Sequence, residues 1–105
     1  MTGAAAAVWV RAVGGDLVSA AAVIHLRCRD GEVEAILAGG ACLRLAGPGC
    51  PPGFHLQLLA ELARARRIYD DRWIVIMSPE VTADGPRWAC ATADDQSMSS
   101  DLDVT

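Results

Sequence analysis

Apolar and polar residues alternate on both sides of an Asp-Gly dipeptide at positions 30 and 31. The segments VIHLRCR (23–29) and EVEAIL (32–37) each have the period of two that is typical of a β-strand. Asp-Gly suits a two-residue hairpin turn because both turn positions need a positive φ. We therefore predict an antiparallel hairpin with one charged face and one apolar face. The predicted pairs are Arg29 with Glu32, Cys28 with Val33, Arg27 with Glu34, Leu26 with Ala35, His25 with Ile36 and Ile24 with Leu37.

Similar alternation extends to both sides of this hairpin. The segments AVWVRAV (7–13) and ACLRLA (41–46) are predicted to be strands, separated from the hairpin by glycine-containing turns. Sequential strands joined by short turns form a meander. The first half of the chain thus predicts a four-strand antiparallel meander.

From residue 54 the apolar period changes from two to about 3.6, which indicates one amphipathic helix over residues 54–69. Pro52 is expected at its first turn. The segment RWIVIMS (72–78) follows as an unbroken apolar run, typical of a strand buried on both faces. After a turn at ADGP, RWACATA (87–93) is predicted as the last strand. The apolar stripe of the helix consists of Phe54, Leu58, Leu62, Ala65 and Tyr69.

These elements predict a single α+β domain in residues 1–93. We expect a mostly antiparallel sheet of about six strands, in the order β-β-β-β-α-β-β, with the one helix packed on one face. The helix should form a right-handed crossover between parallel strands. The strand after it could lie beside the first strand or beside the third.

One helix cannot cover both faces of a six-strand sheet, so the uncovered face is the predicted binding surface. The unbroken run in residues 72–78 leaves two possibilities open, because either Trp73, Val75 and Met77 or Ile74 and Ile76 point to that side. The ligand or interface candidates are Trp73, Val75, Met77, Trp88 and His25.

Composition supports an interaction with a partner. Of the 105 residues, 52% are hydrophobic and only 21% are charged, so we expect some apolar side chains at the surface. Of the thirteen acidic residues, four lie in the last twelve residues, which contain no base and are predicted to be a disordered acidic tail (94–105). The rest of the chain has nine acidic residues against nine arginines. A neutral body offers no long-range attraction to nucleic acid or to an anionic membrane.

The type of basic residue and the first residues of the chain indicate the kind of genome that encodes the protein and its cellular location. All nine basic residues are arginine, which indicates the coding bias of a GC-rich bacterial genome. The apolar run in residues 4–10 is too short for a signal peptide or a membrane span, and no basic residue precedes it. We expect a cytoplasmic protein whose four cysteines are reduced thiols.

A glycine-rich loop joins the predicted meander to the helix. Gly47, Gly49 and Gly53 have a spacing close to that of dinucleotide-binding loops. A phosphate cradle needs backbone N–H donors, yet three prolines in the loop have none. We therefore predict a corner between strand and helix rather than an anion site.

The cysteines and histidines offer weak candidates for metal binding and for catalysis. Cys42, Cys50 and His55 could bind zinc, with Cys28 or Cys90 as a fourth ligand, but their spacing lacks the close pairs of known zinc sites. Cys50 could be a nucleophile near the helix start, where the helix dipole lowers a thiol pKa, with His55 or His25 as its base. No third group orients such a base. We predict no metal, no cofactor and no catalytic residue.

The only basic cluster lies at the end of the predicted helix. It consists of Arg64, Arg66, Arg67 and Arg72. These residues could contact a phosphate or RNA, although cations are favoured at a helix C-terminus in any case. The solvated-face interpretation is preferred because the body of the chain is neutral.

Three functional hypotheses follow. The first is a small non-catalytic association module, homodimeric through the sheet face that the helix leaves uncovered. The alternative is a small-molecule-binding domain or small enzyme with an apolar cavity between sheet and helix, using Trp73, Trp88, Met77 and His25. The third is nucleic-acid binding through the arginine cluster.

Overall fold

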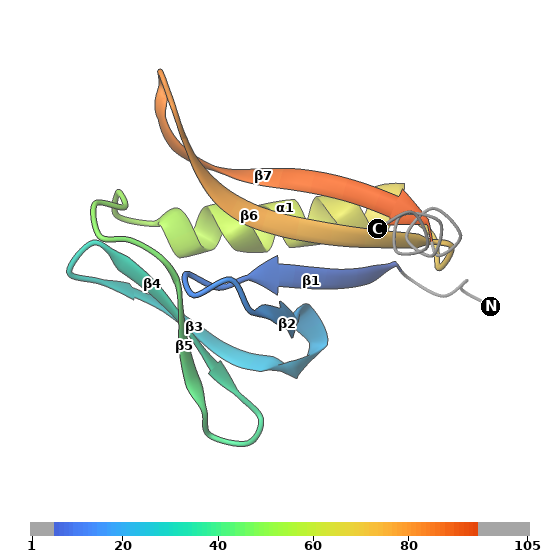
Figure 1. Ribbon diagram of the computed structural model, residues 1–105, viewed down its shortest axis with the longest axis horizontal. Coiled ribbons are helices and arrows are strands. Elements are labelled where there is room, and N and C mark those ends of the chain that lie inside the picture. The colour runs from blue at the N-terminus through green and yellow to red at the C-terminus, as the bar shows by residue number, and fades with distance from the viewer. Residues whose placement is uncertain (1–5, 95–105) are drawn as a thin grey trace.

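The computed structural model describes residues 6–94, which form seven β-strands, one α-helix and one short 3-10 helix. The strands make two sheets, one with the order β2-β1-β6-β7 and one with the order β3-β4-β5 (Figure 1). In chain order the elements are β1 (Ala7–Arg11), β2 (Leu17–Ser19), η1 (Ala20–Ala22), β3 (Val23–Arg29), β4 (Glu32–Leu37), β5 (Cys42–Ala46), α1 (Phe54–Ile68), β6 (Trp73–Thr82) and β7 (Gly85–Asp94).

The single α+β domain with one helix is confirmed, but the strands divide between two sheets instead of forming one. The predicted four-strand meander is therefore shortened to the three strands β3, β4 and β5. The division arises where β2 pairs back onto β1 and the chain then enters η1. Ser19 stabilises this exit from the sheet, because its hydroxyl accepts a hydrogen bond from the backbone N–H of Ala21 at 3.3 Å.

The predicted β3-β4 hairpin is present, and five of its six residue pairs are confirmed. Asp30 and Gly31 have φ values of 54° and 75°, as the predicted turn requires. The sixth pair is wrong because a bulge shifts the register, so that Val23 lies opposite Leu37. Ile24 becomes the extra residue and remains 66% exposed instead of joining the apolar inner face.

The strand after the helix lies beside the first strand, which is one of the two positions that the sequence left open. β6 pairs in parallel with β1 and antiparallel with β7. The strands on either side of the helix, β5 and β6, lie in different sheets and do not pair with each other. The parallel partner of β6 is β1. Helix α1 thus carries the chain from the second sheet to the first.

The core lies between α1 and the inner faces of the two sheets. The predicted apolar stripe of the helix is confirmed, since Phe54, Leu58, Leu62 and Ala65 are buried. The helix begins two residues after Pro52, because Gly53 precedes it in the left-handed conformation with φ 81°. The buried strand residues that meet this stripe include Val8, Val10, Val33, Ala35, Leu45, Val75, Met77 and Trp88.

Strands β6 and β7 are each ten residues long, longer than predicted, and the turn of the hairpin that they form projects from the rest of the domain (Figure 1). Val81, next to this turn, is 85% exposed.

The predicted acidic tail lies outside the described residues except for Asp94, which ends β7. Across the part of the chain that is described, no helix has the length and apolar character needed to cross a membrane.

Candidate functional site

The glycine-rich loop packs tightly against the turn of the β3-β4 hairpin. A Cβ atom on Gly47 would lie 2.6 Å from the backbone oxygen of Gly31 and 2.8 Å from Cα of Glu32, and φ of Gly47 is +116°. The backbone N–H of Cys50 donates to the same Gly31 oxygen at 2.9 Å. These contacts give Gly47 a packing role, and they support the interpretation of the loop as a corner.

The four cysteines are free thiols that lie in different surroundings. Burial raises the pKa of the Cys50 thiol, and neighbouring Cys28 and Glu32 raise it further. The pKa of Cys50 is therefore raised and not lowered as the nucleophile hypothesis expects. Cys42 is exposed at the opposite end of β5, with its sulfur 4.0 Å from the guanidinium of Arg27. In residues 6–94, no three side chains of His, Cys, Asp or Glu come together as metal ligands would.

The two histidines lie on different elements. His55, in the first turn of α1, has a buried Nδ1 atom without a hydrogen-bond partner among the described residues. His25 is exposed on β3. The structure therefore does not gather Cys42, Cys50 and His55 into one site.

The arginine cluster separates in space. Arg64 lies 3.8 Å from Glu61 and lines a polar pocket against β7, whereas Arg66 lines an apolar cavity against β3. Residues two positions apart on a helix point in different directions, which accounts for the separation. Arg72 binds Asp70 at 3.1 Å, and this guanidinium lowers the pKa of the Asp70 carboxyl. Arg64 and Arg66 therefore line different pockets, and Arg72 is paired with Asp70.

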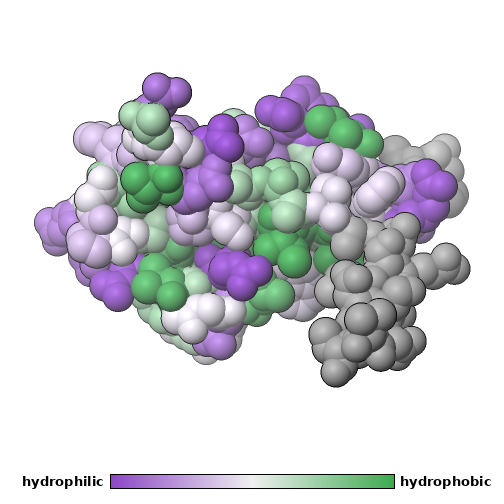
Figure 2. All heavy atoms as spheres, turned by 45° about the horizontal axis from the view of Figure 1, so that its top comes forward, coloured by the Kyte–Doolittle hydropathy of each residue, from purple (hydrophilic) through white to green (hydrophobic). Residues whose placement is uncertain are grey.

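The outer face of the β2-β1-β6-β7 sheet is the uncovered surface. Val75 and Met77 are 0% exposed and belong to the core face. Of the two possibilities that the sequence left open, Ile74 and Ile76 are therefore the residues that point outward. Trp73 lies on the core side as well, where its ring meets Tyr69 edge-on with 5.8 Å between centroids. Figure 2 shows hydrophobic side chains in the middle of the face that it draws, and further hydrophobic groups toward its left and upper right among hydrophilic ones.

Trp9 is a further member of this outer face that was not among the predicted ligand or interface candidates. It is half-buried, while its neighbours Val8 and Val10 are buried in the core. The alternation of β1 was the signal that could have placed it there, because successive side chains of a strand point to opposite faces.

The outer face of the β3-β4-β5 sheet is charged. Arg27 binds Glu34 and Arg44 binds Glu32, both at 2.7 Å, and Arg29 lies 3.7 Å from Glu34. The charged hairpin face is therefore present as predicted. Glu32 lies opposite Arg29 in the register, but its ion pair is with Arg44 of β5. The two sheets thus present opposite kinds of surface to the outside.

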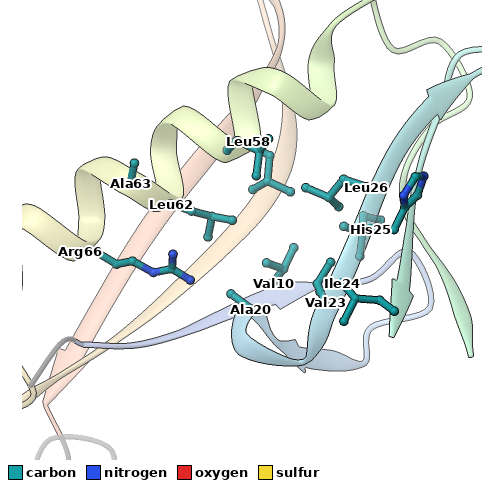
Figure 3. A pocket seen from close by; sticks show the side chains of 12 residues that line it. Val10, Ala20, Val23, Ile24, His25, Leu26, Leu58, Leu62, Ala63 and Arg66 are labelled. Carbon is teal, nitrogen blue, oxygen red and sulfur yellow. The ribbon is translucent and has the colours of Figure 1, made fainter. Parts of the chain in front are cut away.

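A cavity of about 420 Å³ opens to the surface between α1 and β3 (Figure 3). Of the residues assigned to an apolar cavity from the sequence, His25 lines it, whereas Trp73, Met77 and Trp88 do not. The lining residues come from five elements and are Val10, Ala20, Val23, Ile24, His25, Leu26, Leu45, Leu58, Leu59, Leu62, Ala63 and Arg66.

No family model matches the chain, and neither a curated protein nor a solved structure is significantly similar to it.

Proposed function

We propose that this protein is a small non-catalytic association module that forms a homodimer through the outer face of the β2-β1-β6-β7 sheet. The observation that supports this function is the apolar band on that face, which is centred on Trp9, Ile74 and Ile76. Within residues 6–94, no helix covers this side. A sheet face of this kind is normally buried against another layer.

The register of the strands makes the apolar band continuous. Trp9 of β1 lies beside Ile76 of β6, and Ile76 lies beside Ala91 of β7. At one end of the band the side chain of Arg11 donates to Ser78 Oγ at 3.4 Å. An aromatic residue at the centre with polar groups at the rim is the usual arrangement of a protein interface.

A second copy of the chain is the occupant that the charge distribution favours. The nine arginines of residues 1–93 are matched by nine acidic residues, so the bodies of two copies have little net repulsion. Sheet faces stack about 10 Å apart with their strands rotated by about 30°. Two copies related by a two-fold axis would therefore bury the same band on each.

Sedimentation velocity of the full chain across the micromolar range tests this function. We expect a concentration-dependent equilibrium between monomer and dimer. Ile76→Asp should shift it to the monomer, because a carboxylate would be buried without a partner. The matched control is Ile36→Asp on the charged outer face of the second sheet, which should leave the dimer intact. A monomer at every concentration, or equal dissociation by both variants, would refute the homodimer.

The cavity between α1 and β3 supports a second candidate function, the binding of a small molecule. The nucleic-acid alternative has less support, because Arg64 and Arg66 lie on different sides of α1.

A further inference from the structure

The floor of the cavity between α1 and β3 is apolar and well packed. Leu58 and Leu62 of α1 face Val10 of β1 and Leu45 of β5, and all four are buried in the core. Side chains that are fixed by such packing do not have to be ordered when a ligand binds. The volume of about 420 Å³ lies within the range of about 300–1,000 Å³ that is typical of small-molecule sites.

Large apolar side chains remain in water at the opening of this cavity. Ile24, the bulged residue of β3, and Leu59 of α1 both line it and are 66% and 48% exposed. An apolar chain lying in the cavity would remove part of both surfaces from water, which is favourable at about 25 cal/mol per Å². Bulges are common next to functional sites, because they redirect a side chain without ending the strand.

Arg66 is the one permanently charged side chain among the described residues that line the cavity. No carboxylate belongs to the lining, whose polar side chains are those of His25 and Arg66. Figure 3 shows Arg66 extending past Leu62 toward Ala20, whereas the ring of His25 lies on the other side of β3 from Leu26. No carboxylate of residues 6–92 forms a salt bridge with Arg66, in contrast to Arg64 and Arg72, which pair with acidic neighbours.

We propose that this cavity binds a straight-chain carboxylate, with the alkyl chain against Leu58 and Leu62 and the carboxylate at Arg66. The guanidinium group can donate two parallel hydrogen bonds to a carboxylate, and the described lining residues include no acidic side chain that would compete for it. An apolar floor with one cation at its edge selects a molecule that has an apolar chain and a single anionic end. This assignment is independent of dimerisation, because the cavity lies on the inner side of β1 and the apolar band lies on the outer side.

Calorimetric titration of the full chain with hexanoate, octanoate, decanoate and dodecanoate, each below its micelle concentration, tests the assignment. Each added methylene should tighten binding about three- to fourfold until the cavity is filled, after which the affinity should level off. The Ile76→Asp protein should bind the same series equally well, which separates this result from the oligomeric state. Absence of saturable binding, or affinities that do not depend on chain length, would overturn the proposal.

Two variants test the geometry. Arg66→Gln should weaken octanoate binding about fivefold or more and leave octanol binding unchanged, while the adjacent Arg67→Gln serves as the control. Ala63→Phe should fill the opening and abolish binding of the whole series without disturbing the core, because Ala63 is exposed. Circular dichroism verifies that both proteins are folded. Equal effects of Arg66→Gln and Arg67→Gln, or full binding by Ala63→Phe, would contradict the assigned position of the ligand.

Discussion

The indole Nε1–H of Trp88 donates a hydrogen bond to the backbone oxygen of Phe54 at 2.8 Å. The two rings also stack, with 4.8 Å between their centroids and 19° between their planes. Trp88 belongs to β7 and Phe54 is the first residue of α1. This pair therefore fixes the start of the helix against the last hairpin, in a place where no side chain caps the helix.

Replacing this indole tests the importance of its hydrogen bond. Trp88→Phe keeps an aromatic ring but removes the donor, and we expect a loss of about 1–3 kcal/mol in the free energy of unfolding. The control is Trp73→Phe, because the indole of half-buried Trp73 donates no hydrogen bond to a residue of the range 6–92. Urea denaturation measures both. Equal losses would show that the donor at Trp88 contributes nothing specific.

Gly47 should tolerate no side chain. Gly47→Ala would place a methyl group against the backbone of Gly31 and Glu32 at a φ of +116°, so we expect it to destabilise the protein by about 2 kcal/mol or more. Gly39→Ala is the matched control, since a Cβ atom there meets nothing within 4 Å. Thermal unfolding should show a clear drop for the first variant and a change of no more than about 0.5 kcal/mol for the second. Similar stabilities would mean that the loop is not packed as described.

The ion pair between Arg27 and Glu34 should contribute to the acid sensitivity of the fold. Its hydrogen bond holds the pKa of Glu34 below its ordinary value of 4.5. A lowered carboxyl pKa stabilises the folded state above that ordinary value, and the contribution is lost as the pH falls through the folded pKa.

A double-mutant cycle isolates this contribution. Glu34→Gln should flatten the decline of unfolding free energy below about pH 4.5. In the Arg27→Gln background the same substitution should flatten it much less, because the main cause of the pKa shift is then absent. Urea unfolding at a series of pH values measures both effects. An undiminished effect of Glu34→Gln in that background would assign the shift to another group.

Cys50 should be an unreactive thiol. Burial raises its pKa, which lowers the fraction of thiolate at neutral pH, and the side chain is only partly accessible. Iodoacetamide should therefore modify the peptide that contains Cys50 more slowly than the peptide that contains exposed Cys42. Mass spectrometry of the native protein measures both rates. Faster modification of Cys50 would revive the hypothesis of a nucleophile at the helix start.

The local elements could be predicted from the sequence because their signals are local. The Asp-Gly turn and its flanking alternation give the register of β3 and β4, and the 3.6-residue period gives the buried stripe of α1. The bulge at Ile24 has no such signal in the sequence, because it depends on the direction in which the chain passes from η1 into β3. The run in β6 has no alternation, so its outward residues became clear only from the position of the helix.

The candidate sites were harder to predict. The outer band combines Trp9 with Ile76, and the cavity combines Val10 with Leu45 and Leu62. These residues are far apart in the sequence, and none belongs to a motif with a fixed spacing. The pairing of β1 with β6 brings Trp9 to Ile76, and the packing of both sheets against α1 brings the cavity residues together; no periodicity indicates either arrangement.

The parallel pair of β1 and β6 has a consequence for the order of folding. Arg11 and Ser78, which meet at the end of this pair, are 67 residues apart, whereas β3, β4 and β5 are joined by short turns. Closing a long loop costs conformational entropy before its contacts form, and non-local pairing slows folding. The three-strand sheet and the local β1-β2 pair can therefore assemble early, while the β1-β6 pair requires the long intervening chain to close. The folding rate should be limited by the meeting of these two strands.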